Sequence, residues 1–372
     1  MLFSNVAGQE YLKDHFIKEI NTGKISHARL FLGQSGAGTL PLALSFVQYL
    51  FCKNKGEHDS CGQCDQCVKV SQLQHPDLHF SFPTVQADAK FSREKLKEWR
   101  KQISDNPYFN SKDWVNFIDP KGRNAIIGSE ESLEIVKALS LKSYEGSYKV
   151  MVIWCANDMN VTAANKLLKI LEEPPAKTLF FLIAESEDTI LKTILSRTQI
   201  VKVPRLDTDA IARYLQAKLG LTMNTASNLA TRCEGDLRLA IEMADNADVN
   251  ADDLKQFIHF MRICYKKDVI AMMEWSDAMG SESRERQKAF CNYSLHMFRQ
   301  SILKNYTQDI LVRLTDEEAD FLKNFARFIT GNNIMDFNQT FNDAIYHIDR
   351  NANAKIILTN VCFKVMRYIH FA

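Results

Sequence analysis

The hydrophobic pattern in the first half of the chain alternates between short, continuous apolar runs and longer amphipathic stretches. Three runs are continuous and apolar: Leu30–Leu32, Val150–Cys155 and Thr178–Ala184. Runs of this kind are typical of strands that are buried on both faces of a sheet. Thr39–Phe51 and Val161–Glu173 have apolar residues at helical spacing, and the second stretch ends at Pro174-Pro175. This succession predicts an α/β domain with a parallel sheet over residues 1–204.

The pattern becomes wholly helical after Pro204. Three stretches are predicted as the helices of a small domain over residues 205–247: Asp207–Leu219, Asn224–Cys233 and Asp236–Ala244. Amphipathic stretches recur between residues 248 and 372, among them Ala319–Ile329 and Asn353–Ile369. There is no proline from about residue 250 onwards, so this last part is predicted to be a separate all-α domain.

Residues 81–130 have the weakest pattern of the first domain. Phe82-Pro83 opens a polar stretch, Ser92–Ser104 has helical spacing, and Asn106-Pro107 interrupts it. We interpret residues 81–130 as an insertion within the α/β domain.

Length and charge restrict the classes of protein to which the chain can belong. With 372 residues it is long enough for two or three domains, each with its own core. Its 46 basic and 45 acidic residues give a formal net charge of +1, which argues against a large, uniformly basic surface. No run approaches the roughly 20 apolar residues that span a bilayer, and charges near the N-terminus interrupt any signal-peptide core. We expect a soluble, cytoplasmic protein without a membrane partner.

A glycine-rich loop, Gly33-Gln34-Ser35-Gly36-Ala37-Gly38-Thr39-Leu40, directly follows the first predicted strand. Its outer glycines have the spacing of the phosphate-binding loop G-x-x-x-x-G-K-[ST], between a strand and a helix. In such loops the lysine neutralises the β- and γ-phosphates and the hydroxyl holds Mg²⁺. Thr39 and Leu40 stand at these positions and supply neither group. Gly33, Gly38 and Thr39 are therefore expected to belong to a degenerate loop.

Four of the nine cysteines are close together in the sequence: Cys52, Cys61, Cys64 and Cys67. Zinc favours tetrahedral coordination by thiolates, and the two C-x2-C spacings let neighbouring cysteines bind one ion. Four sulfur ligands leave no open coordination position, so a structural zinc is predicted at about residues 52–67. The alternatives are an iron–sulfur cluster, which also takes four thiolates, and four reduced thiols that are neighbours by chance. His58 and His75 are interpreted as bystanders.

Four stretches, in this order, carry a resemblance to a known family. They are Ile25-Ser26-His27-Ala28, the cysteine cluster followed by His75-Pro76-Asp77, Asn165–Pro175 with the sequence N-K-L-L-K-I-L-E-E-P-P, and Ile194-Leu195-Ser196-Arg197. The chain resembles bacterial DNA polymerase III clamp-loader subunits of the AAA+ class. It is more similar to the delta-prime type than to the ATP-hydrolysing gamma/tau type. The resemblance covers about residues 25–240 and implies an AAA+ domain, a small helical lid domain and an all-α, collar-like domain.

The chain departs from the family pattern at positions that bind or hydrolyse ATP in other members. In members that hydrolyse ATP, an Asp-Glu pair holds Mg²⁺ and polarises water, and alignment backward from the E-E-P-P segment puts Trp154-Cys155 at that pair. Asp158 follows a few residues later, but we do not favour it as a substitute. The sensor position of the next strand falls near Ala184-Glu185, where a glutamate would repel a γ-phosphate. With the degenerate loop, these departures imply that ATP neither binds to this chain nor is hydrolysed by it.

Two arginines match elements that the chain retains. Ser196-Arg197 resembles the family's Ser-Arg-Cys element, with Thr198 in place of the cysteine. The resemblance implies that Arg197 is an arginine finger for the γ-phosphate of nucleotide bound by a neighbouring subunit. The alternative is an arginine that pairs with a local carboxylate or caps the preceding helix. Arg238, in the sequence G-D-L-R-L-A, matches the second-sensor element and is interpreted as a structural residue because the local site is degraded.

The resemblance implies a non-hydrolysing subunit of the replicative clamp loader. It would sit in a heteropentameric ring with gamma/tau-like ATPase subunits and a delta subunit, and help to load the sliding clamp onto primer–template DNA. Two alternatives stay open. One is an active gamma/tau-like ATPase with an unusual loop. The other is a stand-alone, zinc-stabilised nucleic-acid-binding protein, against which the near-neutral charge argues.

Overall fold

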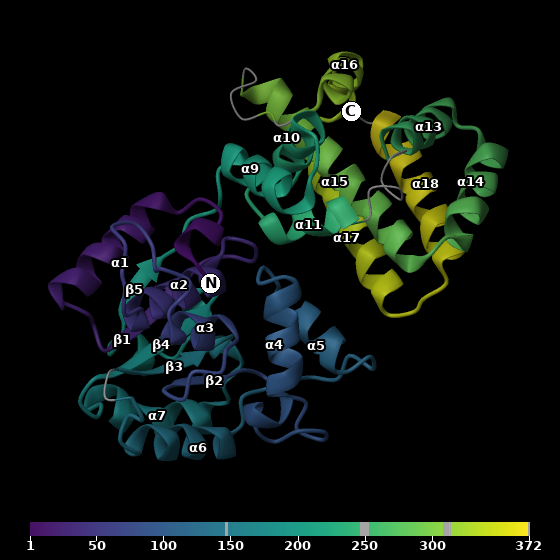
Figure 1. Ribbon diagram of the computed structural model, residues 1–372. Coiled ribbons are helices and arrows are strands. Elements are labelled where there is room, and N and C mark those ends of the chain that lie inside the picture. Colours follow the sequence, from purple (N-terminus) through teal and green to yellow (C-terminus); the bar gives the residue numbers. More distant parts are fainter. Residues whose placement is uncertain (146–147, 246–252, 308–311, 313, 371–372) are drawn as a thin grey trace. The chain divides into compact units, whose positions relative to one another are not determined.

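The computed structural model describes residues 1–145, 148–245, 253–307, 312 and 314–370 (Figure 1). The chain forms two compact units. The first comprises residues 1–226 and 235–240, and the second comprises residues 227–234 and 241–372.

A parallel sheet forms the centre of the first unit. Its strands are β1 (Ala28–Leu32), β2 (Leu78–Ser81), β3 (Lys149–Ile153), β4 (Thr178–Ala184) and β5 (Gln199–Lys202). Their order is β2-β3-β4-β1-β5, and all neighbours are parallel. Every residue of the three inner strands is buried, which explains their continuous apolar sequences and confirms those predictions. The two edge strands were not predicted, because their sequences mix polar and apolar residues.

Helices cover both faces of this sheet, as the sequence predicts. One face packs against α1 (Glu10–Thr22), α2 (Thr39–Phe51) and α3 (Asp65–Ser71). The other face packs against α6 (Ser129–Ser140), α7 (Val161–Glu172) and α8 (Lys192–Leu195), and Figure 1 shows α6 and α7 side by side. Because successive strand residues face opposite sides, Phe31 and Phe181 lie in the first core, whereas Leu30 and Phe180 lie in the second.

Between β2 and β3 the chain leaves the sheet and returns to it. This excursion contains a 3₁₀ helix (Ser92–Lys95), α4 (Leu96–Asp105) and α5 (Ser111–Ile118). At its base, the N–H of Thr84 donates to the carbonyl of Ile126 at 3.1 Å, and the N–H of Ile126 donates back at 3.0 Å. The predicted helix over Ser92–Ser104 and the break at Asn106-Pro107 are confirmed.

Three helices follow Pro204, as predicted to within a few residues: α9 (Thr208–Leu219), α10 (Met223–Arg232) and α11 (Leu237–Asp245). The division between the two units runs through α10 and α11. The grouping of these helices into a domain over residues 205–247 stays a prediction, and residues 246–252 lie outside the described residues.

The described part of the second unit is helical. It contains α13 (Asp253–Lys266), α14 (Val269–Ser281), α15 (Arg284–Tyr306), α16 (Asp316–Phe325), a 3₁₀ helix (Ala326–Phe328), α17 (Ile334–Asp349) and α18 (Ala354–His370). The predicted Ala319–Ile329 covers α16 and the 3₁₀ helix in part, and Asn353–Ile369 corresponds to α18. Phe257, Phe290 and Phe341 lie in one hydrophobic core that the described helices of the second unit share. None of the described helices is both long and apolar enough to cross a bilayer.

Candidate functional site

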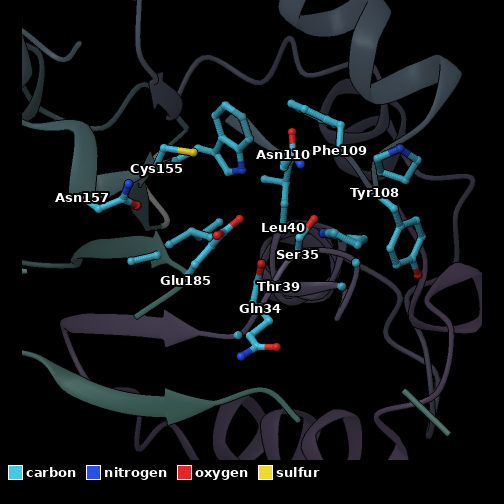
Figure 2. Close-up of a pocket in the computed structure, with 18 residues that line it drawn as sticks. Gln34, Ser35, Thr39, Leu40, Tyr108, Phe109, Asn110, Cys155, Asn157 and Glu185 are labelled. Carbon is cyan, nitrogen blue, oxygen red and sulfur yellow. The ribbon is translucent and has the colours of Figure 1, made fainter. Parts of the chain in front are cut away.

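The glycine-rich loop lies between β1 and α2, as predicted. The N–H of Gly33 donates to the carbonyl of Ala184 at 3.2 Å and so anchors the loop to β4. Gly36 and Gly38 have φ angles of 73° and 89°, a conformation that glycine adopts without strain. The loop borders a small pocket that is partly open to solvent (Figure 2). The opposite wall comes from the α4–α5 loop, residues 106–110.

The side chains that line the pocket differ from those of a phosphate-binding loop. Thr39 and Leu40 begin α2, and Leu40 is 3% exposed because it packs into the core beside the sheet. None of the lining side chains that the structure describes belongs to a lysine or an arginine. The structure thus brings Gly33, Gly38 and Thr39 together at one pocket, with Leu40 at the position of the Mg²⁺-binding hydroxyl residue.

Trp154 and Cys155 follow β3 directly and line the same pocket. Trp154 is 4% exposed, and its ring centroid lies 4.8 Å from that of Phe109 and 5.2 Å from that of Trp99. Burial raises the pKa of the Cys155 thiol well above its ordinary value. An indole and a neutral thiol cannot replace the carboxylates that coordinate Mg²⁺.

Carboxyl groups lie around the pocket. Glu185 lines it, and Asp236 lies so close to the loop that a Cβ atom on Gly36 would be 1.9 Å from its Oδ1. Asp158 accepts a hydrogen bond from Ser111 Oγ at 3.0 Å, and burial raises the pKa of Asp158. Burial likewise raises the pKa of Asp236. Where they are ionised, these acids place negative charge beside the loop, and that charge would repel a bound polyphosphate.

The α4–α5 loop contributes Tyr108 and Phe109 to the pocket (Figure 2). The hydroxyl oxygen of Tyr108 accepts a hydrogen bond from the N–H of Ala7 at 2.8 Å, and a Cβ atom on Gly38 would lie 3.1 Å from the Tyr108 ring. Sequence reasoning did not identify these residues. The available signal was the density of aromatic residues within 81–130, which is unusual for an exposed polar insertion.

Arg238 lies at the start of α11, beside the loop. The N–H of Leu237 donates to the carbonyl of Gly36 at 3.3 Å and holds α11 against it. The Arg238 guanidinium forms a two-pronged ion pair with Asp113 of α5, in which Nη2 lies 2.9 Å from Oδ1. This pairing fits the interpretation of Arg238 as a structural residue, with a partner that the sequence did not indicate.

Arg197 lies just after α8 and has local partners. Its Nε donates to Glu172 Oε1 at 2.7 Å, and its Nη1 donates to the carbonyl of Thr193 at 2.8 Å and to Ser196 Oγ at 3.1 Å. The side chain keeps 29% of its surface exposed. In the isolated chain, Arg197 thus makes the local contacts that the alternative interpretation describes.

The four cysteines meet between the end of α2 and the start of α3. Their Sγ atoms all lie within 4.8 Å of one another, and those of Cys61 and Cys67 are 3.9 Å apart. Four sulfurs at about 2.3 Å from one ion, placed at the corners of a tetrahedron, lie about 3.8 Å apart. The cluster therefore fits a single tetrahedral ion. His58 and His75 lie outside this group of ligands.

Backbone donors surround the sulfurs. The N–H of Cys61 donates to Cys52 Sγ at 3.3 Å, and the N–H of Cys64 donates to Cys61 Sγ at 3.4 Å. Hydrogen bonds from the backbone of Gln63 and Cys64 lower the pKa of the Cys61 thiol to about 6. These hydrogen bonds favour the thiolate form of Cys61, which is the form that binds a metal, whereas burial raises the pKa of the Cys52 and Cys67 thiols.

The sequence matches the model of the family described as "DNA polymerase III, delta subunit" over residues 8–207, more than half of the chain. The chain belongs to this family. A delta-prime subunit from Bacillus subtilis is 29% identical over 249 residues, which cover 67% of this chain and 62% of that protein. A tau subunit from Escherichia coli is 27% identical over 255 residues, which cover 67% of this chain and 33% of that protein. The Escherichia coli delta-prime subunit is 27% identical over 187 residues, which cover 50% of this chain and 45% of that protein.

These matches confirm the resemblance to DNA polymerase III clamp-loader subunits and the AAA+ class of the fold. A solved gamma subunit-related protein from Thermotoga maritima aligns with 97% of this chain and all of that chain, at 15% identity and a TM-score of 0.42. The chain spans only a third to about two thirds of the length of the first relatives that it matches. Because delta-prime and tau subunits match about equally well, the choice between them depends on the residues of the site.

Proposed function

We propose that the chain is a delta-prime-like clamp-loader subunit that does not hydrolyse ATP. The observation that supports this most strongly is the pocket beside the glycine-rich loop. There Thr39, Leu40 and Trp154 take the places of an ammonium group, a hydroxyl and a carboxylate. Hydrolysis needs positive charge and Mg²⁺ at the β- and γ-phosphates, whereas the charged side chain that lines this pocket is the carboxyl group of Glu185.

In this proposal, Arg197 acts on nucleotide that a neighbouring subunit binds. Its guanidinium is always charged, and its planar fork of donors suits the oxygens of a γ-phosphate. To reach a neighbour, Arg197 would exchange the Glu172 carboxylate for a phosphate. Such an exchange replaces one anionic partner with another, so the guanidinium is never left desolvated and unpaired. Ser196, whose hydroxyl contacts Nη1, would orient it.

The proposed assembly is a heteropentameric ring in the cytoplasm. Gamma/tau-like ATPase subunits and a delta subunit would be the partners, and the ring would load a sliding clamp onto primer–template DNA. The formal net charge of +1 supports a subunit of an assembly rather than a stand-alone nucleic-acid-binding protein, since duplex binding depends mainly on phosphate neutralisation. An AAA+ domain, a lid domain and a collar domain, over residues 1–204, 205–247 and 248–372, belong to this proposal.

We propose zinc as the ion of the cysteine cluster. Cys52, Cys61, Cys64 and Cys67 would be its ligands, and four thiolates leave no position for a substrate. When bound, the ion would join the end of α2 to the start of α3 and so stabilise this part of the α/β domain.

A binding measurement with labelled Mg-ATP and the full chain tests whether the pocket beside the glycine-rich loop binds nucleotide. We expect no saturable binding up to millimolar nucleotide. Saturable binding would support the second candidate, an active gamma/tau-like ATPase, which the match to tau subunits over 67% of the chain favours.

ATPase measurements on a reconstituted ring test whether Arg197 is an arginine finger. We expect Arg197→Ala to leave ring assembly intact and to reduce ATP hydrolysis at the site it serves by roughly 10³–10⁵-fold. Arg197→Lys should restore little, because an ammonium lacks the fork geometry. Lys192→Ala, on the short helix that precedes Arg197, is the matched control and should have normal activity. An Arg197→Ala ring with normal stimulated ATPase activity would show that Arg197 is not a finger.

A further inference from the structure

Residues 107–110 of the α4–α5 loop line one side of the pocket. Figure 2 shows Tyr108, Phe109 and Asn110 across the pocket from Ser35 and Thr39. Tyr108 is 2% exposed and Phe109 is 8% exposed, so these side chains are part of the packed interior. The segment is therefore not an exposed loop that happens to lie near the pocket.

Successive residues of this segment contact the glycine-rich loop and the residues that follow β3. Tyr108 packs on Gly38 of the glycine-rich loop, and Phe109 packs on Trp154 after β3. Ser111 donates a hydrogen bond to Asp158, which follows the same strand. At a glycine-rich loop between a strand and a helix, a phosphate ligand would lie within reach of these same positions.

Asp113, two residues after Ser111, adds a further contact, its ion pair with Arg238. A guanidinium binds a carboxylate through two parallel hydrogen bonds, and it binds a phosphate in the same way. Asp113 is also held rigidly, because it forms a capping box with Asn110 at the start of α5. The carboxylate is thus a fixed anion next to Asn110, which lines the pocket, and its cationic partner belongs to α11.

We propose that residues 106–113 are a built-in substitute for nucleotide. They fill the side of the pocket, and Asp113 holds Arg238, and with it the start of α11, against the glycine-rich loop. This inference rests on the proposed function, because it explains how a subunit without nucleotide keeps α11 in place. Such a subunit has one fixed arrangement of α11 and the loop, whatever nucleotide its neighbours carry.

Hydrogen–deuterium exchange of the full chain tests the role of Asp113. Asp113→Asn keeps an oxygen for the capping box and removes the charge that binds Arg238. We expect it to speed amide exchange at the start of α11 by roughly 5- to 30-fold, the factor that corresponds to a loss of about 1–2 kcal/mol. Arg238→Gln should give the same increase, and the double variant should add little to either single one.

Asp105→Asn, an exposed acid at the end of α4, is the matched control and should leave exchange in α11 unchanged. Exchange in β4 reports global unfolding and should stay slow in every variant. Unchanged exchange at the start of α11 in Asp113→Asn, or fully additive effects in the double variant, would overturn the inference. Neither result bears on Mg-ATP binding by the wild-type chain, which tests the proposed function separately.

Discussion

Replacing Phe109 with Ala tests whether the α4–α5 loop belongs to the packed core of the first unit. Phe109 is 8% exposed, and its ring centroid lies 4.8 Å from that of Trp154 and 5.6 Å from that of Trp99. Truncation of a buried Phe to Ala costs about 3–5 kcal/mol, the lost transfer free energy plus the cavity. Since a loop can relax into part of the space, we expect the lower end of this range, about 3 kcal/mol.

Urea unfolding followed by tryptophan fluorescence measures this loss. Trp99, Trp114 and Trp154 lie in the first unit and Trp275 lies in the second, so the measurement uses a Trp275→Phe background. With a slope of about 2–3 kcal/mol/M, a loss of about 3 kcal/mol lowers the midpoint by about 1–1.5 M.

Phe117→Ala is the matched control, because Phe117 lies on α5 but is 39% exposed. It should lower stability by less than about 1 kcal/mol, since surface truncations have small effects. If Phe109→Ala shifts the midpoint no more than Phe117→Ala does, the loop is not part of the core and the reasoning fails.

Three further predictions concern other parts of the first unit. Cys64→Ser should reduce bound zinc below one ion per chain and lower the thermal midpoint, whereas Cys233→Ser should keep the zinc content; a metal assay decides. Asp158→Asn should raise stability at pH 7, because the pKa of Asp158 in the folded chain lies above its ordinary value of 3.8 and its ionisation therefore opposes folding. This gain should vanish as the pH falls through the folded pKa to below 3.8, and a gain that grows toward acid would contradict it. Gly36→Ala should cost about 1–3 kcal/mol from its φ of 73°, plus the clash with Asp236. Gly122→Ala, with a φ of 62° and open space around it, should show the strain alone in thermal unfolding.

The architecture of the first unit could be predicted because its inner strands are buried on both faces. Burial on both faces leaves continuous apolar runs such as Thr178–Ala184, which need no partner to be recognised. The glycine-rich loop and the cysteine cluster were also readable, since each consists of residues close together in the sequence. The edge strands were missed because partial exposure gives them a mixed pattern.

The contacts of residues 106–113 with the rest of the first unit could not be predicted in the same way. Asp113 and Arg238 are 125 positions apart, and neither residue type nor spacing indicates such a pair. Tyr108 and Phe109 stand in a segment without periodicity, so their burial depends on a surface that only the folded sheet provides. The sequence analysis gave a local carboxylate as an alternative partner of Arg197. It did not identify Glu172 as that carboxylate.

The degenerate positions and the excursion between β2 and β3 are related through Trp154. A carboxylate at that position would lie beside Phe109 and Trp99, where burial without a cation is costly. An indole instead extends the aromatic cluster of the excursion and stabilises it by burying apolar surface. In the proposed function, the absence of a carboxylate at position 154 and the packing of the α4–α5 loop beside the pocket are therefore linked through Trp154. Restoring Asp at position 154 alone would destabilise the excursion before it could create a working nucleotide site.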